Sequence, residues 1–420
     1  MRLKIMTLAF LTLCIMPLRA CERSPQDAGE LKTAAPESVG MSSQKLAAID
    51  TLIEQAIAGR IVPGTVVLVA KDGRVVYHKA FGRANLDRPM STDTIFQIYS
   101  SSKIVTSIAV MQLVEQGLLR LDDPISKFIP EFASLTVKEP LPEGSTPPFR
   151  LVPAQSAPTL RQALAMTTGI VGYMDTEFIH YGVDIGIGDP DFDLAENVRR
   201  LAKMPLRFQP GAEFSYGLSN DVAGRVVEVA SGMSLAEYYQ KHIFGPLGMR
   251  DSFFYPPAEK ASRVAPSWEG DGRRLTGRVV PYTFKNRRLY SSGNGLFTTT
   301  SDYFRMGQML LNGGEYGGVR ILMPESVKEI RTNQIGDLPG VVNFVFFQKG
   351  YDRYGLGCFI NGKDSVRDPG SISVLGLGGK NLDLNFERRL IVLVMQTVLP
   401  PQAAWEISEE VSRLVSAALN

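Results

Sequence analysis

Two hydrophobic patterns follow one another at the start of the globular region. Within residues 42–60 the apolar positions recur every three or four residues, which predicts an amphipathic helix capped by a serine at its start. Segments 64–70 and 74–81 are rich in valine and tyrosine, and Asp72-Gly73 between them is typical of a tight hairpin turn. The pattern therefore predicts a helix followed by a strand hairpin.

Helical spacing dominates the middle of the chain. Residues 100–116 have the pattern of a helix that Gly117 ends. Segments 139–158, crowded with proline, and 167–193, rich in glycine, aspartate and aromatic residues, predict long loops of the kind that often border a site. Further helices are predicted over residues 159–166, 194–203, 218–231 and 234–244.

Strand patterns return near the end of the chain, over residues 354–361, 371–378 and 390–398, before a last helix over 405–419. The strands at the two chain ends have no other obvious partners, so we expect one sheet built from both ends. This gives an α/β (α+β) fold with an antiparallel sheet. Its domains would be a sheet domain of residues 41–99 and 281–420, and a mainly helical inserted domain of residues 100–280.

The N-terminus has the features of an export signal. Arg2 and Lys4 precede an almost unbroken apolar run over residues 5–17, too short to span a bilayer of roughly 30 Å. Leu18-Arg19-Ala20-Cys21 resembles the bacterial lipobox, although Arg19 stands where that motif has a small or apolar residue. We expect a signal peptide over 1–20, a tether over 21–40, a periplasmic location and lipidation of Cys21, which would attach the chain to a membrane. Simple cleavage after Ala20 is the alternative.

Charge and cysteine content exclude several classes of protein. The 420 residues include 45 Lys+Arg and 43 Asp+Glu, and a net charge of +2 gives no reason to expect nucleic acid as a partner. Cys14, Cys21 and Cys358 leave a single thiol in the globular part, so neither a disulfide scaffold nor a zinc ribbon is possible. The three histidines form no local metal motif, and we expect no metal and no cofactor.

Ser100 and Lys103 are the first candidates for chemistry. Their spacing places the amine one helical turn after the hydroxyl, where a lysine with a lowered pKa can take the serine proton. A chain of this length contains Ser-x-x-Lys about once or twice by chance, and Ser42 to Lys45 is a second copy that fits an N-cap. Ser100 differs because the apolar segment 95–99 leads into it and would bury Lys103. No Gly-x-Ser-x-Gly motif accompanies the histidines, so a Ser-His-Asp triad is disfavoured, with His180 its only candidate.

Several ordered segments resemble the serine β-lactamase-like group, which includes class C β-lactamases, D-alanyl-D-alanine carboxypeptidases and family VIII esterases. The resemblance covers roughly residues 40 to 400 and implies the fold of that group, with Ser100 as acylated nucleophile and Lys103 as its proton partner. Tyr216 would be the phenol that shares the proton transfer. The segments that carry the resemblance are 100–103, 112–117, 121–124, 159–164, 168–170, 210–216, 244–249, 295–299 and 309–314.

Two departures from the group's motifs concern the substrate. Leu218 stands where β-lactamases have the asparagine of Tyr-x-Asn, and Val374-Leu375-Gly376, or in a shifted alignment Leu377-Gly378-Gly379, stands in place of Lys-Thr-Gly. The backbone N–H groups of Ser100 and Leu377 would still form the oxyanion hole. Leu375 and Gly376 would line the substrate site without a charged partner for a carboxylate.

Together with the expected signal peptide, the resemblance implies an exported serine hydrolase that acts on a small ester, amide or β-lactam-like molecule. The apolar third motif favours uncharged, esterase-like substrates, because a carboxylate would lose a charge-assisted hydrogen bond worth about 1.5–3 kcal/mol. One alternative is a β-lactamase or D-alanyl-D-alanine carboxypeptidase that uses Lys380 or Lys363 for the carboxylate. Another is a catalytically inactive binding protein on the same scaffold.

Overall fold

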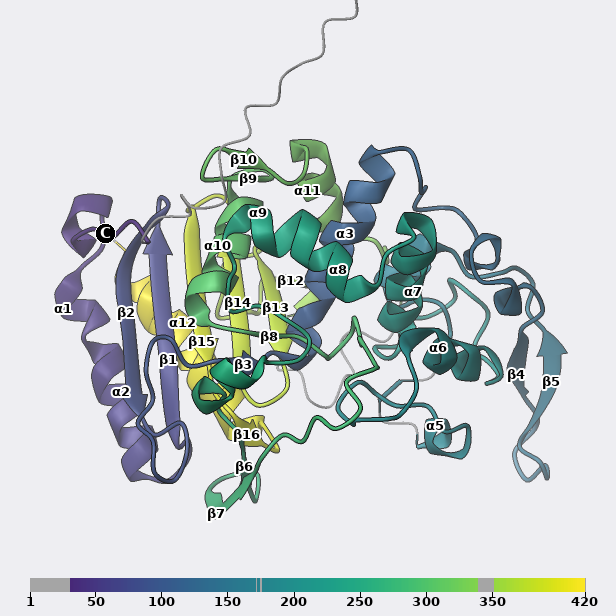
Figure 1. The fold of residues 1–420 in the computed structure, drawn as a ribbon, viewed down its shortest axis with the longest axis horizontal. Helices are drawn as coiled ribbons and strands as arrows, with labels where there is room; N and C mark the ends of the chain where they lie inside the picture. The colour runs from purple at the N-terminus through teal and green to yellow at the C-terminus, as the bar shows by residue number, and fades with distance from the viewer. Residues whose placement is uncertain (1–30, 171, 174–175, 339–350, 420) are drawn as a thin grey trace, which may run out of the picture.

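A seven-stranded antiparallel sheet forms the centre of the computed structural model, which describes residues 31–170, 172–173, 176–338 and 351–419 (Figure 1). The expected signal peptide and Cys21 lie outside the described residues. The strand order is β11-β12-β13-β14-β15-β1-β2. The strands are β1 (Gly64–Lys71), β2 (Arg74–Gly82), β11 (Tyr351–Tyr354), β12 (Phe359–Asn361), β13 (Ile372–Gly376), β14 (Lys380–Asn385) and β15 (Leu390–Met395).

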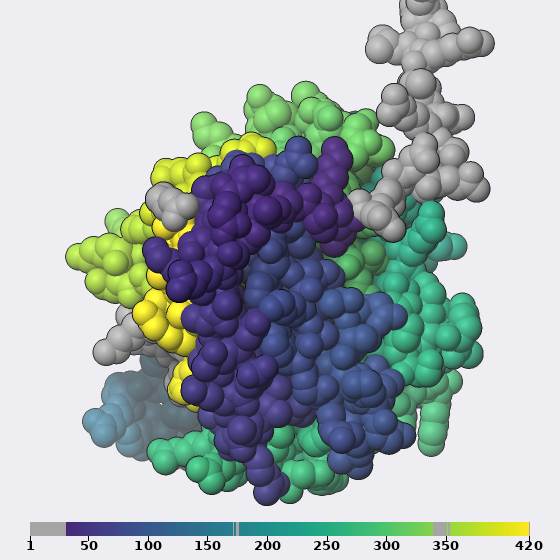
Figure 2. All heavy atoms as spheres, turned by 90° about the vertical axis from the view of Figure 1, so that its left-hand side faces the viewer, coloured from purple at the N-terminus to yellow at the C-terminus, as the bar shows by residue number. Residues whose placement is uncertain are grey.

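Both ends of the chain contribute to this sheet, as the sequence predicts. β1 pairs with β15 in antiparallel register, Val66 opposite Met395 and Lys71 opposite Leu390, and β2 pairs with β1 as the predicted hairpin. In the space-filling view the early residues, in purple, and the last residues, in yellow, lie side by side on one face (Figure 2). The mixed fold with an antiparallel sheet is thus confirmed.

The side chains of the sheet alternate between its two faces and pack into two hydrophobic cores. Val67 and Val69 face a layer of helices formed by both chain ends, whereas Val66 and Leu68 face the larger core that continues into the helical region. The helix predicted over 42–60 is two helices that meet at Ala47. The helices against the first face are α1 (Ser43–Leu46), α2 (Ala48–Ala58) and α12 (Gln402–Ala417), and α3 (Lys103–Glu115) and α10 (Thr300–Leu311) lie in the larger core.

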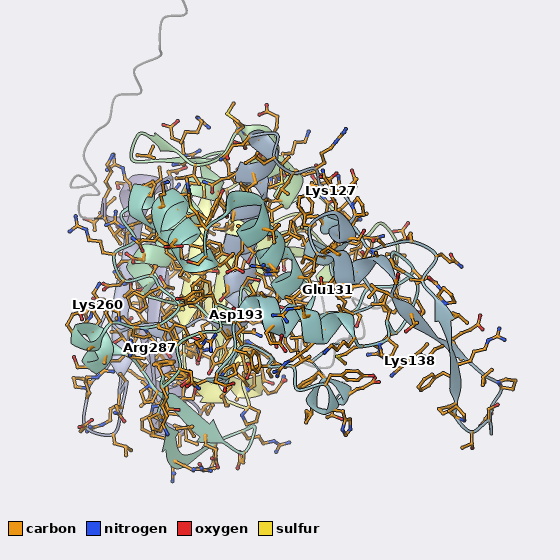
Figure 3. All side chains as sticks on the ribbon, turned by 45° about the vertical axis from the view of Figure 1, so that its right-hand side comes forward. Lys127, Glu131, Lys138, Asp193, Lys260 and Arg287 are labelled. Atoms are coloured by element: carbon orange, nitrogen blue, oxygen red, sulfur yellow. The ribbon has the colours of Figure 1, made fainter. Side chains whose placement is uncertain are left out.

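The middle of the chain is mainly helical, and side-chain caps start several of its helices. Thr159 and Ser234 form capping boxes at α4 and α8, and Asp193, labelled in Figure 3, accepts a hydrogen bond from the Glu196 N–H at the start of α6. The helices of this part and the short one after it are α4 (Leu160–Leu164), α5 (Glu177–His180), α6 (Leu194–Ala202), α7 (Ser219–Ser231), α8 (Leu235–Tyr239), α9 (Gly245–Leu247) and α11 (Pro324–Ile330).

The prediction of a loop over 139–158 is wrong in part. β4 (Thr136–Pro140) and β5 (Phe149–Pro153) form an antiparallel hairpin that projects from the right of the molecule in Figure 1. The prolines lie at the strand ends and in the connection, where no ladder hydrogen bond is needed. Lys138 of β4, labelled in Figure 3, pairs with Glu177 of α5 and ties the hairpin to the body.

The single strand predicted over 354–361 is also wrong. The chain turns between β11 and β12 at residues 355–358, where Gly357 has a φ of +77°. A Cβ on Gly357 would lie 2.7 Å from Ser107 Oγ, so only glycine fits this close approach to α3. The strand predicted over 371–378 ends earlier, at Gly376, and the strand after the next turn, β14, was not predicted. The remaining strands are β3 (Phe96–Gln97), β6 (Ser267–Gly270), β7 (Leu275–Val280), β8 (Phe297–Thr298), β9 (Glu315–Tyr316), β10 (Val319–Arg320) and β16 (Val398–Leu399).

Among the described helices, none combines the length and the apolar character that crossing a membrane would require.

Candidate active site

Ser100 lies in a tight turn between β3 and α3. Tyr99 to Ser102 form a 3₁₀ helix that runs directly into α3 at Lys103. Tyr99 has a φ of +48°, a left-handed conformation that costs a non-glycine residue energy and that clusters at functional sites. The Tyr99 hydroxyl shares hydrogen bonds of 3.1 Å with Ser267 Oγ and Tyr282 Oη, which hold its ring in place.

The two serines after Ser100 fix this turn to its surroundings. Ser101 Oγ donates to the Val374 carbonyl of β13 at 3.5 Å, and the Ser101 carbonyl accepts from Tyr303 Oη at 2.9 Å. Ser102 Oγ accepts from the Leu296 N–H at 3.2 Å. The run of three serines therefore combines one candidate nucleophile with two buried anchors.

Lys103 is fully buried and its amine contacts Ser100. Lys103 Nζ donates to Ser100 Oγ at 2.9 Å, to the Gly293 carbonyl at 2.9 Å and to Tyr173 Oη at 3.2 Å. In the neutral amine one of these three directions becomes a lone pair. The Gly293 carbonyl can only accept, so the lone pair can face a hydroxyl, and Ser100 is one of the two hydroxyls in reach.

Burial makes the neutral amine accessible near physiological pH. It lowers the pKa of Lys103 from 10.5 to about 7, against the carboxylate of Asp221, which raises it. A neutral amine at hydrogen-bond distance can take the Ser100 proton, which a charged ammonium cannot do. The pair thus has the geometry and the protonation equilibrium of a nucleophile and its base.

Tyr216 lies beside the same amine, as the resemblance implies. Lys103 Nζ is 4.9 Å from the centroid of the Tyr216 ring. Burial raises the pKa of Tyr216, and a hydrogen bond with Ser100 opposes this only in part, so the resting phenol is protonated. Phe359 stacks on the ring at 5.6 Å between centroids. Tyr216 can therefore relay a proton but is not a resting phenolate.

Four further groups in this site were missed by the sequence analysis. Asn294 Oδ1 accepts from Ser100 Oγ at 3.1 Å, and Asn294 Nδ2 donates to Tyr173 Oη at 2.9 Å. Gly293 and Asp221 complete the set, since Gly293 holds Lys103 and its N–H donates to Asp221 at 2.8 Å. The polar run Ser291-Ser292-Gly293-Asn294, ahead of an apolar segment, is the signal that could have indicated this loop.

β13 lies against the nucleophile turn, where the third motif is expected. A Cβ on Gly376 would lie 2.2 Å from the Ile98 carbonyl, so glycine allows the strand to approach this closely. Leu375 packs in the cluster that contains Tyr216, and Leu377 lines a cavity beside the turn. The expected roles of Leu375 and Gly376 in lining the substrate site, and of the Leu377 N–H in the oxyanion hole, remain predictions.

No histidine is among the hydrogen-bond partners of Ser100 in the described part of the chain. His78 contacts Thr300 Oγ1 at 3.0 Å, the His242 ring packs at a tilt against Tyr238, and His180 is exposed on α5. Residues 31–170, 172–173, 176–338 and 351–419 hold no cluster of three His, Cys, Asp or Glu side chains that could bind a metal ion.

A partly open cavity of about 360 Å³ adjoins the turn that holds Ser100. Tyr99 and Gly295, the neighbours of Ser100 and Asn294 in sequence, form part of its wall. Its charged lining residues are Asp189 and Glu269, both acidic. Most of the surface is aromatic or aliphatic, with Tyr99, Phe254, Tyr282, Phe284, Phe297 and Leu377 as representative lining residues.

Known proteins share both the sequence pattern and the fold. Esterase EstB of Burkholderia gladioli is 38% identical over 295 residues, which cover 64% of this chain and 71% of that protein. Lovastatin esterase of Penicillium rubens is 30% identical over 381 residues, 84% of this chain and 93% of its own. The solved structure of EstCE1, a hydrolase with promiscuous acyltransferase activity, superposes with a TM-score of 0.74 at 23% identity and covers 89% of this chain and 98% of its own.

A putative D-alanyl-D-alanine carboxypeptidase of Escherichia coli K12 is 25% identical over 374 residues, 83% of this chain and 79% of that protein. The family model described as Beta-lactamase matches residues 49–415, which include Ser100, Lys103 and Tyr216. This match spans the whole sheet and the helical region between its two halves. The chain is therefore a serine hydrolase that belongs to the Beta-lactamase family.

Proposed function

We propose that this chain is an exported esterase that forms an acyl-enzyme on Ser100. The observation that carries the proposal is the buried Lys103 amine, 2.9 Å from Ser100 Oγ, with a pKa lowered by burial to about 7. An inactive binding protein would gain nothing from a buried lysine beside a serine, because burying the amine costs free energy. In an acyl-transfer enzyme the buried amine has a function, because it takes the serine proton.

The acylation step follows from these contacts. Neutral Lys103 takes the Ser100 hydroxyl proton as Oγ bonds to the ester carbonyl carbon, and the carbonyl electron pair moves onto its oxygen. The tetrahedral intermediate then expels the alcohol, which receives a proton from Lys103 directly or through the Tyr216 hydroxyl. Water then takes the place of the alcohol: its oxygen bonds to the acyl carbon as Lys103 takes its proton. The tetrahedral intermediate expels Ser100 Oγ, which recovers a proton, and the acid is released.

The surroundings of the site favour an uncharged substrate with a bulky apolar group. The cavity beside the turn that holds Ser100 is mostly aromatic or aliphatic, and none of its described lining residues is a lysine or arginine that could pair with a carboxylate. Lys380 follows the third motif, but its side chain is buried and its amine lies 4.9 Å from the centroid of the Tyr99 ring. An aryl or branched apolar ester fits this chemistry better than a penicillin carboxylate.

Hydrolysis of p-nitrophenyl esters tests the proposal. Protein without residues 1–21 should hydrolyse these esters, and Ser100→Ala should lower kcat/KM by at least about 10³-fold. Ser42→Ala is the matched control, because Ser42 belongs to the second Ser-x-x-Lys copy and only accepts from the Lys45 N–H as an N-cap. Equal rates in wild type and Ser100→Ala would refute the proposal.

The pH profile and a β-lactam distinguish the alternatives. Because Lys103 must be neutral to act as the base, kcat/KM should fall as the pH drops through about 7. Phenyl acetate and a phenylbutyrate ester should be better substrates than nitrocefin, which carries a carboxylate. Efficient nitrocefin turnover that Lys380→Ala abolishes would instead support the β-lactamase alternative.

A further inference from the structure

Asp221 is a buried carboxylate behind the candidate active site, only 2% exposed, in the first turn of α7. Ser291 Oγ lies 3.0 and 3.1 Å from its two oxygens and shares one proton with them, and the Gly293 N–H donates to Oδ1 at 2.8 Å. Ser292 Oγ lies 3.2 Å from Oδ1 but donates at 2.8 Å to the Asn220 carbonyl. All these donors come from three consecutive residues. Burial raises the pKa of the Asp221 carboxyl, and the Gly293 N–H, the serine hydroxyls and the charge of Lys103 oppose that rise by favouring the ionised form.

The segment that Asp221 holds is the one that contacts the reacting pair. The Gly293 carbonyl accepts from Lys103 Nζ at 2.9 Å, and Asn294 Oδ1 accepts from Ser100 Oγ at 3.1 Å. α7 starts just after Tyr216, so one short stretch of chain supplies both this phenol and the carboxylate. A displaced Asp221 would therefore move the partners of Ser100 and Lys103 together.

Charge links Asp221 to Lys103 as well. A Cβ on Gly293 would lie 3.4 Å from Asp221 Oδ1 and 3.7 Å from Lys103 Nζ, so a single residue separates the carboxylate from the amine. Tyr173 and Tyr239 are the other titratable groups that the Asp221 charge acts on, and burial keeps both phenols protonated. Lys103 is thus the cation that this buried carboxylate can stabilise.

We propose that Asp221 is a positioning residue for acylation, which fixes segment 291–294 and balances the charge of the ammonium that Lys103 becomes. The inference rests on the proposed function. In the step itself the Ser100 proton moves to Lys103 Nζ, the Oγ–C bond forms and the carbonyl oxygen gains the electron pair. Asp221 exchanges no proton in this step, and its negative charge offsets the new positive charge in a buried site.

Asp221→Asn tests this inference with the full pH profile of ester hydrolysis. The amide can still accept from the Gly293 N–H, and its NH₂ group can donate to a serine hydroxyl, but the charge is gone. Without the carboxylate the ammonium form of Lys103 is less favoured, so the acid limb of kcat/KM should move down by roughly one to two pH units. kcat on the alkaline plateau should fall about tenfold or more. A purely structural role would lower kcat or stability and leave the limb in place.

Asp302→Asn is the control, because Asp302 is also a buried carboxylate but accepts from Ser252 Oγ and the Asp251 N–H. The acid limb of its kcat/KM profile should lie at the same pH as that of wild type. An unmoved limb in folded Asp221→Asn overturns the inference, while loss of ester hydrolysis in wild type itself would overturn the proposed function instead. If Asp221→Asn does not fold, Ser291→Ala decides: it removes a hydrogen bond that lowers the pKa of Asp221, so the carboxyl is protonated more readily, and the limb should shift the same way by less. No shift would refute the inference.

Discussion

Replacing Lys380 with methionine is expected to stabilise the protein, most strongly at low pH. Lys380 is the first residue of β14, only 1% of it is exposed, and Nζ has no hydrogen-bond partner among the described residues. A Cβ on Gly378 would lie 2.6 Å from that Nζ, so the amine sits directly behind the turn after β13. Methionine has a similar length and leaves no polar atom that needs a donor or acceptor.

The magnitude follows from the proton equilibrium. Burial lowers the pKa of Lys380 from 10.5 to about 7, and the difference corresponds to about 5 kcal/mol. Below pH 7 the folded and unfolded chains both carry the charge, so the whole penalty is present. Between pH 7 and 10.5 the folded state holds a neutral amine, and wild-type stability rises with pH as the unfolded chain approaches deprotonation. At pH 9 about 2 kcal/mol of the penalty is left.

Urea unfolding at pH 6 and pH 9 measures the effect. Lys380→Met should gain about 5 kcal/mol at pH 6, and the gain should shrink by about 3 kcal/mol at pH 9. Lys79→Met is the control, because Lys79 is half exposed and pairs with Asp50, where the change should stay below about 1 kcal/mol. A gain that is equal at both pH values, or a loss at both, would refute the reasoning that the amine is buried without a hydrogen-bond partner.

Three further predictions concern the site and the N-terminus. Gly376→Ala should lower ester hydrolysis at least about tenfold and lower Tm by several degrees, because its Cβ would lie 2.2 Å from the Ile98 carbonyl. Initial rates and thermal unfolding followed by circular dichroism measure the two effects. A variant with wild-type activity and Tm would contradict the tight packing. Tyr216→Phe should lower kcat more than Tyr173→Phe if Tyr216 relays the proton to the leaving alcohol, and the reverse order in steady-state kinetics would assign the relay to Tyr173. Cys21→Ala should release the expressed chain from the membrane fraction, and an unchanged distribution on fractionation would contradict the lipid anchor.

The strands and helices were predictable wherever the local pattern and the burial agreed. Residues 66–70 are apolar throughout because β1 is covered on both faces, and Gly117, with a φ of +73°, follows α3 as predicted. The Ser100–Lys103 pair was predictable for the same reason. An i, i+3 spacing on a helix that follows an apolar segment determines both the contact and the burial of the amine.

Contacts between distant segments could not be read from the sequence. Asp221 and Ser291 lie 70 positions apart, and nothing in either local pattern shows that they meet. β14 was missed because Lys380, Asn381 and Asp383 read as polar, while the fold buries them against neighbours far along the chain. Asp383, for example, is satisfied by Ser412 of α12 and by Arg367.

Lys103 and Lys380 are both buried, but only Lys103 lies beside a serine that it could activate. Burial brings the pKa of Lys103 and of Lys380 to about 7, but only Lys103 has a carboxylate, Asp221, whose charge raises its pKa. Both amines are fully buried, and burial is the largest cause of each shift. Lys103 nevertheless has three hydrogen-bond acceptors and faces Ser100. A lowered lysine pKa therefore does not identify a base in this fold; the serine oxygen within 3 Å and the counter-charge behind it do.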